Sequence, residues 1–133
     1  MAMIWKSQTP SGKVEVHFSN LSGGNIGWTG KYVTVLDDVG LNFKFFLRDF
    51  NGDGQDDLIA IKKSQTDTNS TEVHILDGAS QFSSFLLHTG TLLHETGANF
   101  EFASEDFNRD GRDDMIAIKK DQTSANRTEV HVL

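Results

Sequence analysis

The chain has 133 residues and a formal net charge of −7, so it is long enough for one ordinary domain or a few repeated units. Hydrophobic residues make up only 37% of it, which argues against a single thick core. There are no cysteines, which excludes a disulfide framework, and no basic stripe that would neutralise the phosphates of nucleic acid. No apolar run is long enough to span a membrane.

The predicted elements are short strands, because their residues are β-branched, aromatic or alternating, and Gly, Asn, Asp or Ser separate them. Residues 82–94 could instead form a short amphipathic helix, which is the main alternative within this all-β interpretation. In chain order, the predicted strands lie at residues 4–5, 14–18, 31–35, 43–48, 58–63, 71–76, 82–88, 100–105, 115–120 and 128–133.

The sequence repeats itself with a period of 57 residues, as the spacing of Asp49 and Asp106 shows. The same shift aligns Ile-Ala-Ile-Lys-Lys at residues 59–63 with residues 116–120, without a gap. A partial third copy precedes them, because Lys-Ser-Gln-Thr at residues 6–9 matches residues 63–66. The chain therefore holds about two and a third repeats.

Each full repeat carries an acidic loop between two predicted strands, at residues 49–57 and 106–114. Both loops follow the pattern Asp-x-Asn-x-Asp-Gly-x-x-Asp, which brings oxygen ligands around a tight turn at Gly54 or Gly111. Ala60 and Ala117 stand where an EF-hand has its bidentate Glu, and strands follow the loops, so an EF-hand is excluded. The pattern favours one structural Ca²⁺ in each loop, and the alternative is an acidic turn without metal.

The predicted calcium ligands are four side chains and one backbone carbonyl in each loop. They are Asp49, Asn51, Asp53, Asp57 and the Gln55 carbonyl in the first loop, and Asp106, Asn108, Asp110, Asp114 and the Arg112 carbonyl in the second.

The run from Phe through Asp-Phe-Asn-x-Asp-Gly-x-x-Asp to Ile-Ala-Ile, at residues 45–61 and 102–118, resembles the FG-GAP/VCBS family of calcium-loop β-propeller repeats. Such repeats occur in integrin α-chain heads and in secreted microbial lectins and cell-wall hydrolases. The family's usual Phe-Gly and Gly-Ala-Pro signatures are absent here. The resemblance implies an all-β fold of four-stranded antiparallel propeller blades.

Under this resemblance, residues 1–42 form a partial blade with strands two to four, residues 43–99 a full blade, and residues 100–133 a partial blade with strands one to three. A propeller needs about four to eight blades to close. We therefore expect either a homo-oligomer that closes a propeller ring or a fragment excised or engineered from a longer array.

A second set of polar residues also repeats, and it could form a carbohydrate site between blades or a structural hydrogen-bond network. It comprises Glu15, Glu72 and Glu129, His17, His74 and His131, and Lys63 and Lys120, with Trp5, Trp28 and Tyr32 as aromatic candidates. His88 and His94 occur in one repeat only and receive no assigned role.

No catalytic motif stands out, and repeated equivalent sites suit multivalent binding better than an asymmetric active site, so we expect no enzyme activity. The leading expectation is a lectin-like module that binds a glycan or cell-surface polysaccharide. The alternatives are a protein–protein interaction repeat and the cell-wall targeting domain of a secreted hydrolase. Calcium loops suit an extracellular setting, where the ion is abundant.

Overall fold

The computed structural model describes residues 1–22, 25–124 and 126–133, and all of its regular structure is β. Within these ranges no helix is present, so residues 82–94 do not form the alternative helix. Among the described residues there is accordingly no helix that is long and apolar enough to cross a membrane. The prediction of an all-β fold is confirmed.

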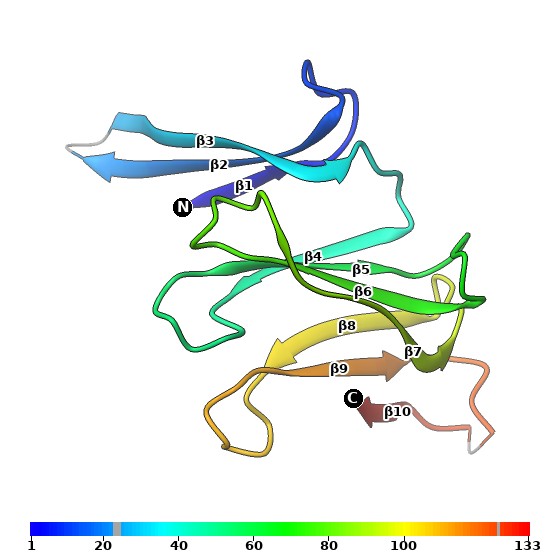
Figure 1. The fold of residues 1–133 in the computed structure, drawn as a ribbon. Helices are drawn as coiled ribbons and strands as arrows, with labels where there is room; N and C mark the ends of the chain where they lie inside the picture. The colour runs from blue at the N-terminus through cyan, green and yellow to red at the C-terminus, as the bar shows by residue number, and fades with distance from the viewer. Residues whose placement is uncertain (23–24, 125) are drawn as a thin grey trace.

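Ten antiparallel strands form three sheets that lie one above the other (Figure 1). The first sheet has the order β1-β2-β3, the second β4-β5-β6-β7 and the third β10-β9-β8. The strands are β1 (Ala2–Trp5), β2 (Lys13–Ser22), β3 (Asn25–Asp37), β4 (Phe43–Arg48), β5 (Asp57–Lys62), β6 (Ser70–Leu76), β7 (Phe85–His94), β8 (Phe100–Glu105), β9 (Asp114–Lys119) and β10 (Glu129–Val132).

One apolar core lies between the first and second sheets. Val14 and Val16 of β2 meet Leu58 and Leu76 of the second sheet, and Phe82 joins them from the β6–β7 connection. These buried side chains alternate along their strands with residues that face the other way, as expected for a strand that packs on one face.

A second core lies between the second and third sheets. It contains Ile59, Ile61 and Ile75 from the second sheet and Phe100 and Phe102 from the third. The middle sheet is covered on both faces, so β5 and β6 are buried along almost their whole length, whereas the two end sheets have one open face each.

The strand that was predicted at residues 82–88 begins only at Phe85 and runs to His94. Gln81 and Phe82 have left-handed backbone conformations, with φ of 60° and 62°. The Asp77 carboxylate accepts hydrogen bonds from the amides of Ala79 and Ser80, at 3.2 and 3.1 Å, and so folds this segment into a turn. Phe82 therefore belongs to a connection and not to a strand.

Candidate functional site: the acidic loops and the Glu-His faces

The first acidic loop connects β4 to β5 and wraps around the Asp49 carboxylate. Its Oδ1 accepts hydrogen bonds from the amides of Gly52 and Asp53 at 2.8 and 3.0 Å, and its Oδ2 accepts one from Gly54 at 2.9 Å. Gly54 has φ of +88°, a conformation that residues with a Cβ rarely adopt. The Asn51 side-chain oxygen accepts a further bond from the Asp53 amide at 2.9 Å.

The second loop, between β8 and β9, repeats this geometry. The Asp106 carboxylate accepts hydrogen bonds from the amides of Asp110 and Gly111, both at 3.0 Å, and Gly111 has φ of +87°. The Asn108 oxygen accepts the Asp110 amide at 2.8 Å, as Asn51 does in the first loop. The two loops therefore share one backbone path, fixed by the same residue types.

The last aspartate of each loop begins the following strand, and the two copies differ in burial. Asp57 is fully buried, and its carboxylate accepts the amides of Phe50 at 3.1 Å and Gly78 at 2.8 Å. Burial raises the pKa of Asp57, although these amide bonds oppose the shift. Asp114 is only half-buried and accepts bonds from the Phe107 and Asn108 amides within its own loop.

The donor set of each loop suits a hard cation such as Ca²⁺. Three carboxylates and an Asn oxygen are present, and an oxygen that accepts one amide bond keeps a second lone pair for a metal. In residues 1–22, 25–124 and 126–133, however, no group of three or more His, Asp or Glu side chains converges as a metal cage. In this structure, Asp49 and Asp106 accept hydrogen bonds from the amides of their own loops, whereas Asp57 also accepts the amide of Gly78 outside its loop.

The Glu-x-His pairs lie at the same position in all three sheets, but their surroundings differ. In the first sheet, Glu15 is fully buried and accepts hydrogen bonds from Ser11 Oγ at 2.7 Å and His17 Nε2 at 2.9 Å, and Lys31 Nζ lies 3.1 Å away. These partners, Ser11 foremost, lower the pKa of Glu15 to about 2. The group is a closed polar network on the open face of the sheet.

In the second sheet, the equivalent pair lies between two sheets. Glu72 accepts hydrogen bonds from the Thr68 side chain at 2.9 Å and the Thr68 amide at 3.2 Å. Burial raises the pKa of Glu72, but the Thr68 bonds and the nearby charge of Lys62 outweigh it, so the pKa is lowered. The side chains of Glu72 and His74 are each 6% exposed, which leaves no room for a sugar.

His74 is the least satisfied polar group of the second sheet. Its Nε2 lies 3.6 Å from the nearest Glu72 oxygen, and neither ring nitrogen has a hydrogen-bond partner among the described residues. Its ring lies among aromatic neighbours, 4.4 Å from the ring of His88 and 6.1 Å from that of Phe43 between centroids. Burial, and then the charge of His88, lower the pKa of His74, so the ring is neutral at pH 7.

In the third sheet, His131 Nε2 lies 3.8 Å from Glu129, at a groove that is also lined by Leu93, His94 and Phe100.

The lysines near the repeated glutamates differ from the predicted ones. Lys62 and Lys119 lie opposite Glu72 and Glu129 in the strand register, whereas Lys120 pairs with Glu101 at 3.2 Å and Lys63 lies after the end of β5. Each predicted lysine partner is therefore one residue too late in the chain. A shift of one residue along a strand moves a side chain to the other face of the sheet.

The predicted aromatic residues separate into two groups. Trp5 and Trp28 flank His17 on the open face of the first sheet, with ring-centroid distances of 6.2 and 5.6 Å, and they are 40% and 62% exposed. Tyr32 lies on the opposite face and packs edge-on against Phe18 and Phe82 at 5.8 and 6.0 Å, within the core. Trp5, Trp28 and His17 therefore form one surface, which Met3 and Lys31 complete.

Three residues of these networks were missed in the sequence, although the repeat carries a signal for two of them. Ser11 and Thr68 are separated by one period and make the same bond to Glu15 and Glu72. Lys31 corresponds to His88 in the next repeat, so residue type alone did not mark it as a repeated feature.

The model of the FG-GAP-like repeat family matches residues 49–117, which is more than half of the chain and includes both acidic loops. No curated protein and no solved structure shows significant similarity to the chain. The three stacked antiparallel sheets are those of propeller-type blades, in an arrangement that does not close into a ring. The chain belongs to the FG-GAP-like repeat family.

Proposed function

We propose that this chain is a non-catalytic, calcium-stabilised propeller module that binds carbohydrate through the open face of its first sheet. The observation that carries the proposal is the surface of Trp5, His17 and Trp28, which lies directly above the buried Glu15 and beside Lys31. Two exposed indole rings on one face are uncommon on a monomeric surface and often mark a binding site.

The chemistry of this surface suits a sugar. Indole rings pack against the apolar C–H face of a pyranose, and the Trp5 N–H donates to the Ser7 carbonyl at 2.8 Å, which holds that ring in place. Lys31 is half exposed at its side chain, so its ammonium group can reach ligand hydroxyls while it stays near Glu15. We expect a short, neutral or acidic glycan, because Lys31 is the exposed charge of this surface.

The equivalent positions in the other sheets support different roles. The Glu72–His74 pair is enclosed and serves packing, whereas the Glu129–His131 groove is open but is lined by one aromatic ring, Phe100, in place of two indoles. A single weak site per chain becomes effective when several copies bind together, which favours a homo-oligomer acting on an extracellular polysaccharide.

We assign one Ca²⁺ to each acidic loop, with a structural role. The ion would neutralise the loop carboxylates and hold β4 to β5 and β8 to β9 at their connected ends. The loops and the indole surface belong to different sheets, so calcium would support the fold and not contact the sugar.

A glycan array tests the proposal when it is probed with the wild-type chain, with Trp28→Ala and with Leu92→Ala, an exposed apolar position on β7. We expect glycan binding by the wild type and Leu92→Ala, and its loss in Trp28→Ala. Binding restricted to peptidoglycan or chitin fragments would identify a cell-wall targeting domain. An array on which the folded wild type binds nothing would refute carbohydrate recognition.

The second candidate function is a protein–protein interaction repeat, and the two open sheet faces favour it. The outer face of the first sheet exposes Met3 and Val33, and that of the third sheet exposes Val130 and Val132, at 43–60%. Within the chain, the equivalent faces of neighbouring sheets pack against each other at both interfaces, between the first and second sheets and between the second and third. Head-to-tail contact between copies would bury both, and sedimentation measurements of the assembly mass test it.

A further inference from the structure

Asn51, in the first acidic loop, is the one asparagine of this sequence that a glycine follows. Both Asn51 and Gly52 are exposed, and Gly52 has φ of +78°. The backbone nitrogen that follows an asparagine can attack the side-chain amide, because the two are held close together by the chain itself. Glycine leaves this nitrogen unhindered, since it has no Cβ. The Asn51–Gly52 step therefore combines exposure with an accessible nucleophile.

The hydrogen bonds around Asn51 suit such an attack. Its Oδ1 accepts the Asp53 amide at 2.9 Å, and negative charge develops on this oxygen when a nucleophile adds to Cγ. A donor that is already in place stabilises that charge. The Gly52 amide donates to Asp49 Oδ1 at 2.8 Å and must leave this acceptor first. That bond is exposed, so water can replace the carboxylate at little cost.

The second loop provides a matched comparison, because Asn108 has similar surroundings but a different successor. Asn108 is also exposed, and its Oδ1 accepts the Asp110 amide at 2.8 Å. Arg109 takes the place of Gly52 and has a similar left-handed backbone, with φ of 63°. The Arg109 side chain crowds the nitrogen that would attack Asn108. The two loops therefore differ in the access to this nitrogen.

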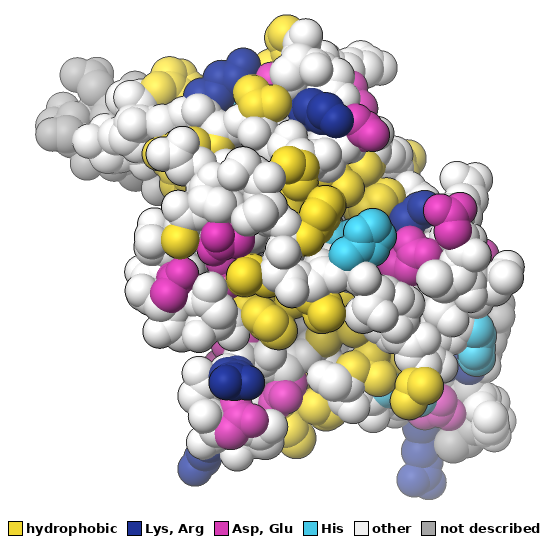
Figure 2. Space-filling view, viewed as in Figure 1, with side chains coloured by type: hydrophobic (Ala, Val, Ile, Leu, Met, Phe, Trp, Pro, Cys, Tyr) yellow, Lys and Arg dark blue, Asp and Glu magenta, His cyan; other side chains and the backbone are white. Residues whose placement is uncertain are grey.

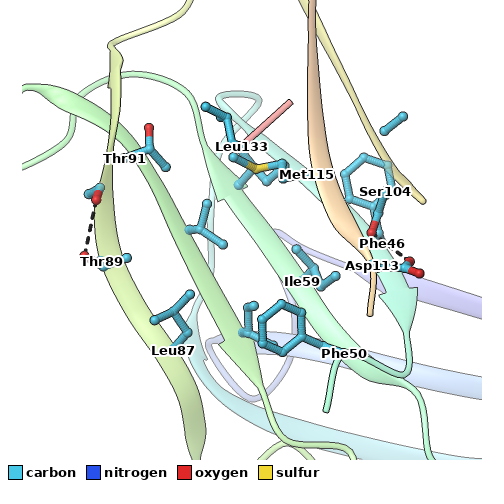
Figure 3. A pocket seen from close by; sticks show the side chains of 15 residues that line it. Phe46, Phe50, Ile59, Leu87, Thr89, Thr91, Ser104, Asp113, Met115 and Leu133 are labelled. Atoms are coloured by element: carbon cyan, nitrogen blue, oxygen red, sulfur yellow. Dashed lines mark hydrogen bonds between the residues drawn. The ribbon is translucent and has the colours of Figure 1, made fainter. Parts of the chain in front are cut away.

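The loops also differ in how firmly they are anchored, and this difference acts in the opposite direction. Phe50, next to Asn51, packs with Ile59 among the side chains that line an apolar space between the second and third sheets (Figure 3). Its counterpart Phe107 is 64% exposed. If freedom of the loop decided the rate of attack, Asn108 would react faster than Asn51. We give more weight to the following residue, because the nitrogen must come into contact with Cγ.

We propose that Asn51 is a site of spontaneous deamidation in the folded chain, and that the equivalent Asn108 is spared. The Gly52 nitrogen loses its proton to hydroxide and forms a bond to Asn51 Cγ. The bond from Cγ to Nδ2 then breaks, and Nδ2 takes a proton from water and leaves as ammonia. Water opens the resulting succinimide at either carbonyl, which gives aspartate or isoaspartate. Water and hydroxide are the only other reactants, and nothing is oxidised or reduced.

This modification makes two loops of the same pattern unequal. Aspartate at position 51 adds a negative charge to a loop that is already acidic. Isoaspartate adds one atom to the main chain before Gly52, which moves the amides of Gly52 and Gly54 away from the Asp49 carboxylate that they now contact. The reaction itself depends on neither the proposed calcium binding nor the proposed sugar binding.

The test is peptide mapping by mass spectrometry of the whole chain, after incubation in a mildly alkaline buffer with EDTA, so that bound metal does not affect the rate. We expect Asn51 to be converted at least tenfold faster than Asn108. In Gly52→Arg, Asn51 should react as slowly as Asn108 does in the wild type. In Arg109→Gly, Asn108 should react as fast as Asn51 does in the wild type.

Both substitutions exchange residues that already occupy the same left-handed conformation, and circular dichroism confirms that each variant is folded. Equal rates at Asn51 and Asn108 in the wild type would overturn the proposal. A rate at Asn51 that Gly52→Arg leaves unchanged would also overturn it, because the glycine would then have no role. Faster conversion of Asn69, an exposed asparagine that serine follows, would assign the reactive site to another loop.

Discussion

At the scale of single residues, the repeated Glu-x-His pair shows how one sequence pattern acquires different energies in different places. In the first sheet, the His17 nitrogen lies 2.9 Å from the carboxylate of Glu15. In the second sheet, the histidine is more deeply buried, but the His74 ring has no hydrogen-bond partner among the described residues. The sequence predicted the pair itself, but it could not distinguish these environments, because they depend on which sheet packs above each face.

This contrast gives a prediction for two matched substitutions. His74→Phe removes a buried unpaired imidazole from an aromatic cluster and raises the free energy of unfolding by about 1 kcal/mol. His17→Phe removes a hydrogen-bond partner of the buried Glu15 and lowers it by about 1 kcal/mol. Urea unfolding measures both, and destabilisation by His74→Phe to the same extent as by His17→Phe would contradict the difference.

Glu15 gives a prediction for acid pH. Its pKa is lowered from 4.5 to about 2, so its carboxylate stabilises the fold above pH 4.5 and this contribution is lost as the pH falls toward 2. We expect the melting temperature of the wild type to fall more steeply over this window than that of Glu15→Gln. Thermal melts at several pH values measure the difference, and parallel curves for the two proteins would show that Glu15 titrates normally.

At the scale of elements, the sequence predicted the strands beside the acidic loops well and the β6–β7 connection poorly. β4 and β8 have the predicted bounds, because alternating Phe residues precede a loop whose glycine fixes the turn. Phe82 belongs to a connection, although Phe-Ser-Ser-Phe looks like the start of a strand. The turn at Phe82 is held by a local bond from its amide to the Asp77 carbonyl at 2.8 Å and by a bond from the Val35 amide to its own carbonyl at 3.1 Å. The second bond comes from the first sheet, and local sequence does not encode it.

The loops give a prediction of stoichiometry. Calorimetric titration of the wild type with Ca²⁺ should show two ions per chain, and EDTA should lower its melting temperature, because an ion that binds only the folded loops would stabilise the fold. Asp53→Ala removes a predicted ligand of the first loop and should leave one ion. Asp67→Asn, an exposed acidic residue outside the loops, is the control and should leave two. Two ions in Asp53→Ala would refute the ligand assignment.

The close contact at Gly78 gives a further prediction about stability. Gly78→Ala forces a methyl group against the Asp56 carbonyl and should lower the free energy of unfolding by about 1–3 kcal/mol. Gly97→Ala places its methyl group 3.3 Å from the movable side chain of Asn99 and should change it little. Equal effects of the two substitutions would mean that the β6–β7 connection can move away from β5 without cost.

At the scale of the whole molecule, the repeat determines which surfaces remain open. Two interfaces between sheets bury apolar side chains, and a face of the same kind is exposed at each end. Figure 2 shows apolar side chains reaching the surface along the middle of the face viewed, flanked by acidic and basic groups. The 57-residue period allowed the sheets to be predicted, but the ligand and the partner depend on side chains that do not repeat, above all Trp5 and Trp28.

Carbohydrate binding by these two residues is the central claim, and both of the chain's tryptophans belong to the proposed site. Titration of the protein with a glycan selected on the array, followed by intrinsic tryptophan fluorescence, tests the claim most directly. We expect a saturable change in fluorescence for the wild type and Leu92→Ala, and at least tenfold weaker binding for Trp28→Ala. Equal affinity of Trp28→Ala and the wild type would contradict it.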